Sequence, residues 1–186
     1  MINHRLISVV FFSPDGLCGV KNCSEDHFSF FIQTGAANVV PPKICLENKL
    51  VLGSATNNAG SGINIVVVNG RTGEVIKSGH FRMYDQDVQG LLDFIKSIEK
   101  GSAVLMASFD EPATNLNDEA KELIGELGSS AIQSLGFRDN WVFVGAKGGG
   151  MKSSLEKHLK NDKENNKYEG WPEVIDLEGC IPKYME

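Results

Sequence analysis

The sequence predicts a single domain of the α+β class. Its 186 residues, of which 41% are hydrophobic, suffice for one well-buried core. Segments typical of β-strands, joined by local turns, fill the first half of the chain, whereas helical periodicity is concentrated in the second half. This separation favours an α+β fold over a regular alternation of strands and helices.

The first elements expected are two strands near the beginning of the chain. Residues 27–34 and 43–52 are rich in aromatic and branched side chains, and the turn-prone residues 35–42 lie between them. An antiparallel pair is therefore expected here.

Residues 62–81 contain the clearest hairpin. Residues 62–70 (GINIVVVNG) are an apolar run bounded by glycines, and residues 74–81 (EVIKSGHF) follow it. The dipeptide Asn69-Gly70 is a favoured hairpin turn, so the two segments should pair.

Two longer helices are expected further along the chain. The first should begin at Asp87, as its N-cap, and end at Gly101. Its apolar residues recur at the spacing of one helical face, at Val88, Leu91, Leu92, Ile95 and Ile98. The apolar run of residues 103–109 predicts a central strand, after which Asn117 should cap a second helix that Gly128 ends.

A short helix over residues 129–135 and a strand over residues 141–146 should come next. Because side chains alternate along a strand, Trp141 and Phe143 must share one face, with Val142 and Val144 on the other. The run of apolar residues predicts that both faces are covered.

The remaining elements are short. Ser153 and Glu156 have the spacing of a capping box, which predicts a brief helix. A last strand is expected over residues 173–177, close to the final cysteine.

Charge and hydropathy exclude two classes of partner. The formal net charge is -6 and no run of basic residues could follow a phosphate backbone, so we expect no nucleic-acid binding. No stretch reaches the roughly 20 apolar residues that a spanning helix needs. Residues 1–17 resemble a poor or truncated leader, and residues 18–186 are expected to form the single domain.

The four cysteines have several possible states. They are Cys18, Cys23, Cys45 and Cys180, and their even number permits two bridges in three connectivities. The paired spacing of a zinc site is absent. Four buried free thiols in a cytosolic protein are the alternative.

No motif indicates catalysis, a cofactor or a metal. The segment that begins at Asp85 starts like a calcium loop, but its twelfth position is Lys96 in place of glutamate. The glycine-rich stretches fit neither nucleotide-binding pattern, and the histidines lack a zinc-protease spacing. We therefore expect a non-enzymatic protein without a cofactor or a metal.

Asp110 and Arg138 are the candidate ligand-binding residues. Asp110 follows a predicted buried strand, and Arg138 stands just before another, each with aromatic neighbours. Carboxylate, guanidinium and aromatic groups at strand ends suit the binding of a sugar or a peptide. The alternative is an Asp–Arg ion pair that only orders the loops.

The chain resembles the secreted family that contains interleukin-like EMT inducer and pancreatic-derived factor. The resemblance extends from about Cys18 to Pro182. The matching segments are residues 34–40 (TGAANVV), 42–47 (PKICLE), 62–65 (GINI), 68–70 (VNG), 116–120 (LNDEA), 135–143 (LGFRDNWVF), 166–173 (NKYEGWPE) and 178–182 (EGCIP).

This resemblance implies a compact β-β-α domain of two antiparallel sheets with short helices packed against them. It also implies the disulfides Cys18–Cys45 and Cys23–Cys180, and hence an oxidising compartment. The expected function is that of a secreted, cytokine-like signalling factor that binds a cell-surface receptor or another protein.

The same domain resembles a GG-type lectin module, in which an Asp and an Arg contact sugar. Those positions match Asp110 and Arg138 here, which makes a glycan the alternative ligand. A further Arg of the lectin pattern is Ser61 in this sequence. The loss of that charged donor counts against a strong glycan site.

Overall fold

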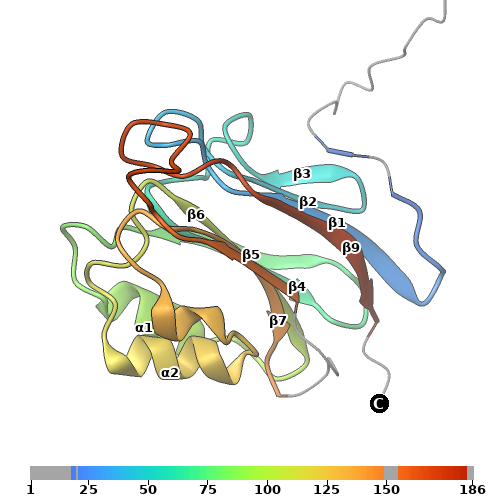
Figure 1. Ribbon diagram of the computed structural model, residues 1–186. Coiled ribbons are helices and arrows are strands. Elements are labelled where there is room, and N and C mark those ends of the chain that lie inside the picture. The colour runs from blue at the N-terminus through green and yellow to red at the C-terminus, as the bar shows by residue number, and fades with distance from the viewer. Residues whose placement is uncertain (1–17, 20, 149–154, 184–186) are drawn as a thin grey trace, which may run out of the picture.

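The computed structural model describes residues 18, 19, 21–148 and 155–183. It has two antiparallel sheets and a pair of helices, which confirms the α+β class (Figure 1). The leader predicted over residues 1–17 and the predicted cap at Ser153 lie outside the described residues.

The smaller sheet has four strands in the order β3-β2-β1-β9. Their bounds are His27–Gln33 for β1, Lys43–Leu46 for β2, Lys49–Leu52 for β3 and Asp176–Pro182 for β9. The antiparallel pairing of β1 with β9 places the first and last strands of the chain's described part side by side.

The larger sheet has five strands in the order β5-β4-β6-β7-β8. Their bounds are Gly62–Asn69 for β4, Val75–Phe81 for β5, Ser102–Phe109 for β6, Asn140–Ala146 for β7 and Leu155–Leu159 for β8. The pairing of β4 with β5 confirms the predicted hairpin.

The helices are α1 (Gln89–Lys96), α2 (Asp118–Glu126) and the short 3-10 helix η1 (Ala131–Ser134). The side chain of Asn117 accepts a hydrogen bond from the backbone N–H of Ala120, which confirms the predicted cap of α2. The first helix is shorter than expected: it begins at Gln89, and Asp87 accepts a hydrogen bond from the N–H of that residue.

The central strands β4, β6 and β7 of the larger sheet are buried on both faces, and a separate hydrophobic core lies on each face. Trp141 and Phe143 of β7 belong to the core beneath the helices, with their rings stacked at 5.7 Å. Val142 and Val144 belong to the core between the two sheets. The predicted division of this strand between two faces is therefore confirmed.

Three further predicted elements were wrong in their bounds or type. Residues 43–52 form two strands, because Glu47 and Asn48 both have a positive φ, of 49° and 62°, and turn the chain between β2 and β3. The last strand starts at Asp176, three residues beyond the predicted start at residue 173.

The brief helix predicted from Ser153 and Glu156 is also wrong, because Glu156 lies in the strand β8. Leu155 pairs with Val144 there, and the Glu156 carboxylate accepts hydrogen bonds from the backbone N–H groups of Ser130 and Ala131. Sheet pairing and this carboxylate thus override the local helical pattern.

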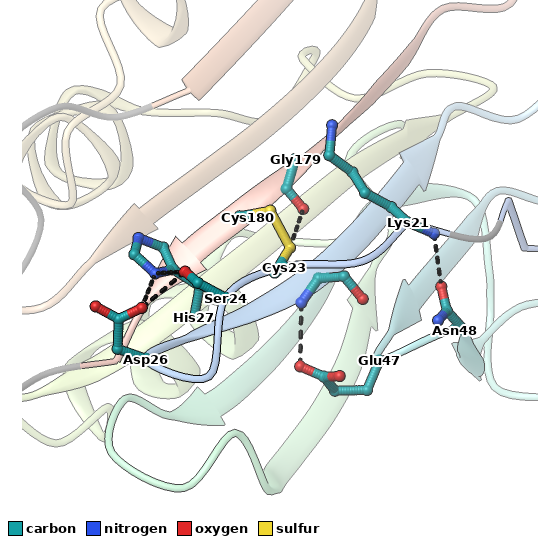
Figure 2. Close-up of a disulfide and its surroundings, with 10 residues drawn as sticks. Lys21, Cys23, Ser24, Asp26, His27, Glu47, Asn48, Gly179 and Cys180 are labelled. Atoms are coloured by element: carbon teal, nitrogen blue, oxygen red, sulfur yellow. Dashed lines mark hydrogen bonds and ion pairs between the residues drawn. A yellow bond between two sulfur atoms is a disulfide. The ribbon is translucent and has the colours of Figure 1, made fainter.

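Both disulfides that the family resemblance implies are present. Cys18 is bonded to Cys45 of β2, and Cys23 is bonded to Cys180 of β9. Figure 2 shows the second bridge beside β1, where it joins the segment before that strand to β9. The backbone N–H of Lys21 also donates to the side chain of Asn48, at 3.2 Å.

Candidate functional site

The candidate site lies at one end of the two packed sheets, where β6 ends and β7 begins. Asp110 follows β6 directly, and Arg138 precedes β7 by two residues. The loop before β9 reaches the same end, where the N–H of Thr34 donates to the carbonyl of Ile175. Figure 1 shows this loop beside the loop that joins β1 to β2.

Asp110 has neighbours from three parts of the chain. Its carboxylate accepts a hydrogen bond from the hydroxyl of Ser61, at 3.1 Å, and its backbone carbonyl accepts one from the indole N–H of Trp171, at 3.2 Å. Arg82 is close enough for the negative charge of Asp110 to contribute to its raised pKa, although the hydrogen bond with Asp85 is the largest cause.

Arg138 lies between two aromatic rings. Its guanidinium carbon is 3.9 Å from the ring centre of Trp171 and 4.9 Å from that of Phe137. Gly170 has a φ of 85°, which favours glycine, and a methyl group added there would come within 2.7 Å of the Nη1 atom of Arg138, which would have to shift. The Nε atom of Arg138 is buried and has no hydrogen-bond partner in the described chain.

Asp110 and Arg138 meet at Trp171, without an ion pair between them. No nitrogen of Arg138 comes within ion-pair distance of the Asp110 carboxylate in the described part of the chain, whereas both residues contact the same indole. The Asp–Arg ion pair, which was the alternative to a ligand-binding role, is therefore not found. The carboxylate and the guanidinium keep separate surroundings, and neither neutralises the other directly.

Both candidate residues have an unfavourable backbone conformation. The φ angle is 61° at Asp110 and 59° at Arg138, in the left-handed region. Aspartate tolerates that region, but arginine rarely adopts it. The surrounding contacts must hold these conformations in place, and such strain is common at functional sites.

Glu111 supplies much of that restraint, and sequence reasoning did not single it out. Its side chain is 2% exposed. The carboxylate accepts hydrogen bonds from the backbone N–H groups of Ala113, Thr114 and Arg138, at 2.8 to 3.1 Å. Glu111 therefore joins the loop after β6 to the loop before β7.

Trp171 was also missed. It stands in a polar stretch of the sequence, 61 residues after Asp110, so spacing gives no indication that the two residues meet. The proline that follows it, Pro172, disfavours a helical backbone at Trp171. The signal in the sequence that could have pointed to Trp171 was a single tryptophan within a polar stretch.

A second polar cluster is centred on Asp139, the residue after Arg138. The Nε2 atom of His158 is 2.7 Å from the Asp139 carboxylate, which also accepts hydrogen bonds from the backbone N–H groups of Gly136 and Asn161. These bonds anchor the loop that carries Arg138. Within the described ranges, no three acidic, histidine or cysteine side chains form a group that could hold a metal ion.

The described cavities are elsewhere. One of about 350 Å³ lies near the ends of α1 and α2 and is lined by Ile95, Lys100, Leu123, Glu126, Leu127 and Lys147, together with Gly148. Two others lie beside β5. None of the three includes Asp110 or Arg138.

Comparison with known proteins gives one consistent result. A family model described as "Interleukin-like EMT inducer" matches residues 61–149. Protein FAM3C of Danio rerio is 57% identical over 89% of this chain and 73% of its own length. Protein FAM3C of Homo sapiens is 54% identical over 93% of this chain and 77% of its own, and Protein FAM3A of Mus musculus is 52% identical over 89% and 73%.

Proposed function

The chain belongs to the interleukin-like EMT inducer family, and from this premise we propose that it is a secreted, cytokine-like factor that acts by binding a protein partner. Family membership is the observation that carries the proposal. The partner would be a cell-surface receptor or another extracellular protein.

The disulfides support secretion. Cys18–Cys45 and Cys23–Cys180 involve all four cysteines of the sequence. Disulfides persist in extracellular compartments and are rare in the cytosol. No helix in the described ranges is long and apolar enough to cross a membrane.

The candidate site supports protein binding. Arginine, tryptophan and other aromatic side chains are enriched at the residues that contribute most to protein interfaces. Here the guanidinium of Arg138 packs against the rings of Trp171 and Phe137 at the loop end of the sheets. The proposal includes no catalytic step, because partner binding alone would account for signalling.

A glycan is the second candidate, and Asp110 with Arg138 is the observation that favours it. A carboxylate beside Ser61 can accept hydrogen bonds from sugar hydroxyls, and aromatic rings can stack on a sugar ring. The lectin-like pattern has a further Arg where this chain has Ser61. A weak affinity for neutral sugars is therefore expected.

Binding of the purified, disulfide-bonded protein to cultured cells would test the proposal. We expect saturable binding that trypsin treatment of the cells abolishes and that enzymatic removal of surface glycans leaves intact. The opposite pattern, with binding to a glycan array, would favour the carbohydrate alternative. Absence of saturable binding to any cell type that responds to the protein would contradict both.

A further inference from the structure

We propose that the loop end of the two sheets is a docking surface for a protein segment that presents an acidic side chain beside a large apolar one. This inference rests on the proposed function, because it assigns the partner's binding site and chemistry. The docking surface comprises Val39, Val40, Phe137, Arg138 and Trp171.

The first argument for the docking surface is that several of its apolar side chains are exposed. Val39 is 77% exposed, Val40 49% and Phe137 48%. Single exposed apolar residues are ordinary, but a contiguous group at one end of a domain indicates a contact surface.

The valines are held outward by a closed turn. The N–H of Ala36 donates to the carbonyl of Val40, and the N–H groups of Val39 and Val40 donate to the carbonyl of Ala36, at 2.9 to 3.1 Å. The exposed apolar groups are therefore ordered before binding, which lowers the entropic cost of association.

A chain of contacts joins this turn to Arg138. The N–H of Gly35 donates to the carbonyl of Ser108, and the Cα of Gly35 lies against the ring of Phe109. Asp110 comes next in the sequence and accepts the hydrogen bond from Trp171, whose ring stacks on Arg138. The valines and the guanidinium thus belong to one continuous end of the molecule.

The second argument for the docking surface is the positive charge of Arg138. Three other cationic side chains each pair with a carboxylate: Arg82 with Asp85, Lys96 with Glu119, and Lys167 with Glu173. Within the described ranges, the side chain of Arg138 has no carboxylate partner and contacts aromatic rings instead. Its positive charge is therefore available to a ligand, and carboxylates are the groups that guanidinium binds best in proteins.

The surroundings of Arg138 favour a protein segment over a polyanion. A sulfated or sialylated polysaccharide would require several cations in a row, and this chain carries a net charge of -6. The guanidinium of Arg138 lies against the aromatic rings of Trp171 and Phe137. A segment with one carboxylate next to a large apolar side chain matches both features of the surface.

The test uses short random peptides displayed on phage and selected on the full disulfide-bonded protein. We expect enrichment of peptides with Asp or Glu beside a large apolar residue. Their affinity should fall at least about tenfold on Arg138→Glu, and less on Arg138→Lys. Higher salt should also weaken the binding.

Three further variants separate docking from folding. Val39→Asp changes an exposed side chain in a turn, so it should keep the melting temperature and still weaken the peptides, whereas Val39→Lys should not weaken them. Lys96→Glu, on α1, makes the same change of charge as Arg138→Glu away from the docking surface. It should leave binding unchanged.

The outcomes distinguish this inference from the proposed function. If the protein binds cells through a protein partner, but Arg138→Glu and Val39→Asp bind the same cells as well as wild type, the docking surface is wrong and the function stands. Selected peptides without acidic residues would contradict the partner's chemistry. Preferential binding of sulfated or sialylated glycans would replace the protein segment.

Discussion

The indole N–H of Trp141 donates a hydrogen bond to the Glu156 carboxylate, at 2.7 Å. The same carboxylate accepts hydrogen bonds from the hydroxyl of Ser129 and from the backbone N–H groups of Ser130 and Ala131. Burial by itself would raise the pKa of Glu156, but these hydrogen bonds outweigh it and lower the pKa from its ordinary value of 4.5. One acidic residue on β8 therefore joins the core tryptophan to the start of η1.

Glu156→Gln should lower the free energy of unfolding by about 1–3 kcal/mol at neutral pH, because buried donors lose a charged acceptor. A carboxylate with a depressed folded-state pKa contributes stability above its unfolded pKa and loses it as the pH falls through the folded pKa. Urea unfolding should be measured at neutral pH and at pH values below 4.5. The free energy of unfolding should fall more steeply with acidification in wild type than in Glu156→Gln. Equal pH dependence in both proteins would count against this role.

Trp141→Ala should lower the free energy of unfolding by about 3–5 kcal/mol, since it opens a cavity in the core beneath the helices. The side chain is fully buried and stacks on Phe143. Phe137→Ala is the matched control, an aromatic truncation at an exposed position, and should change stability by no more than about 0.5 kcal/mol. Denaturant unfolding of both variants would measure the difference, and similar values would contradict the assignment.

Gly62→Ala should destabilise the fold by at least about 2 kcal/mol. The φ angle of Gly62 is 106°, and an added Cβ would lie 1.8 Å from the carbonyl oxygen of Phe81. Gly90→Ala is the control: it lies in α1, where the added methyl group meets only ordinary contacts and alanine favours the helix by about 1 kcal/mol. Melting temperatures should thus move in opposite directions.

Removal of Cys23–Cys180 by paired Cys→Ser substitutions should cost about 5 kcal/mol in the chain-entropy model, and removal of Cys18–Cys45 about 3.6 kcal/mol. The difference arises because Cys23–Cys180 spans 157 residues, whereas Cys18–Cys45 spans 27. Denaturant midpoints of the two double variants would test the order. A larger loss from the shorter bridge would show that local contacts around Cys45 outweigh loop length.

Asp110→Ala should cost about 1–2 kcal/mol, because alanine is disfavoured at a φ of 61° and cannot accept the hydrogen bond from Ser61. Asp110→Asn should leave the melting temperature close to that of wild type, since asparagine tolerates this conformation and keeps an acceptor. A loss of cell binding in the Asn variant, with the fold intact, would assign the Asp110 charge to the ligand.

Local pattern predicted most of the larger sheet, because β4 and β6 are mostly apolar, as expected of strands buried on both faces. It failed at Glu47 and Asn48, since a turn with two positive φ angles usually contains glycine and this one does not. It failed again at Glu156, whose partners are 15 to 27 residues away.

The candidate site, too, could be predicted only in part from the sequence. Their places at the ends of predicted strands and the family resemblance both pointed to Asp110 and Arg138, but nothing in either local sequence indicates that both contact Trp171. Contacts between residues far apart in sequence are set by the packing of the loops, which periodicity does not describe.

The bridge between Cys23 and Cys180 has a consequence for limited proteolysis. Cleavage in the exposed stretch at residues 162–165 would divide the chain between the two cysteines, so both pieces would stay covalently joined. The nicked protein would migrate as one species on a non-reducing gel and as two after reduction. β9 would also remain paired with β1, so cleavage of the backbone there need not release the C-terminal strand.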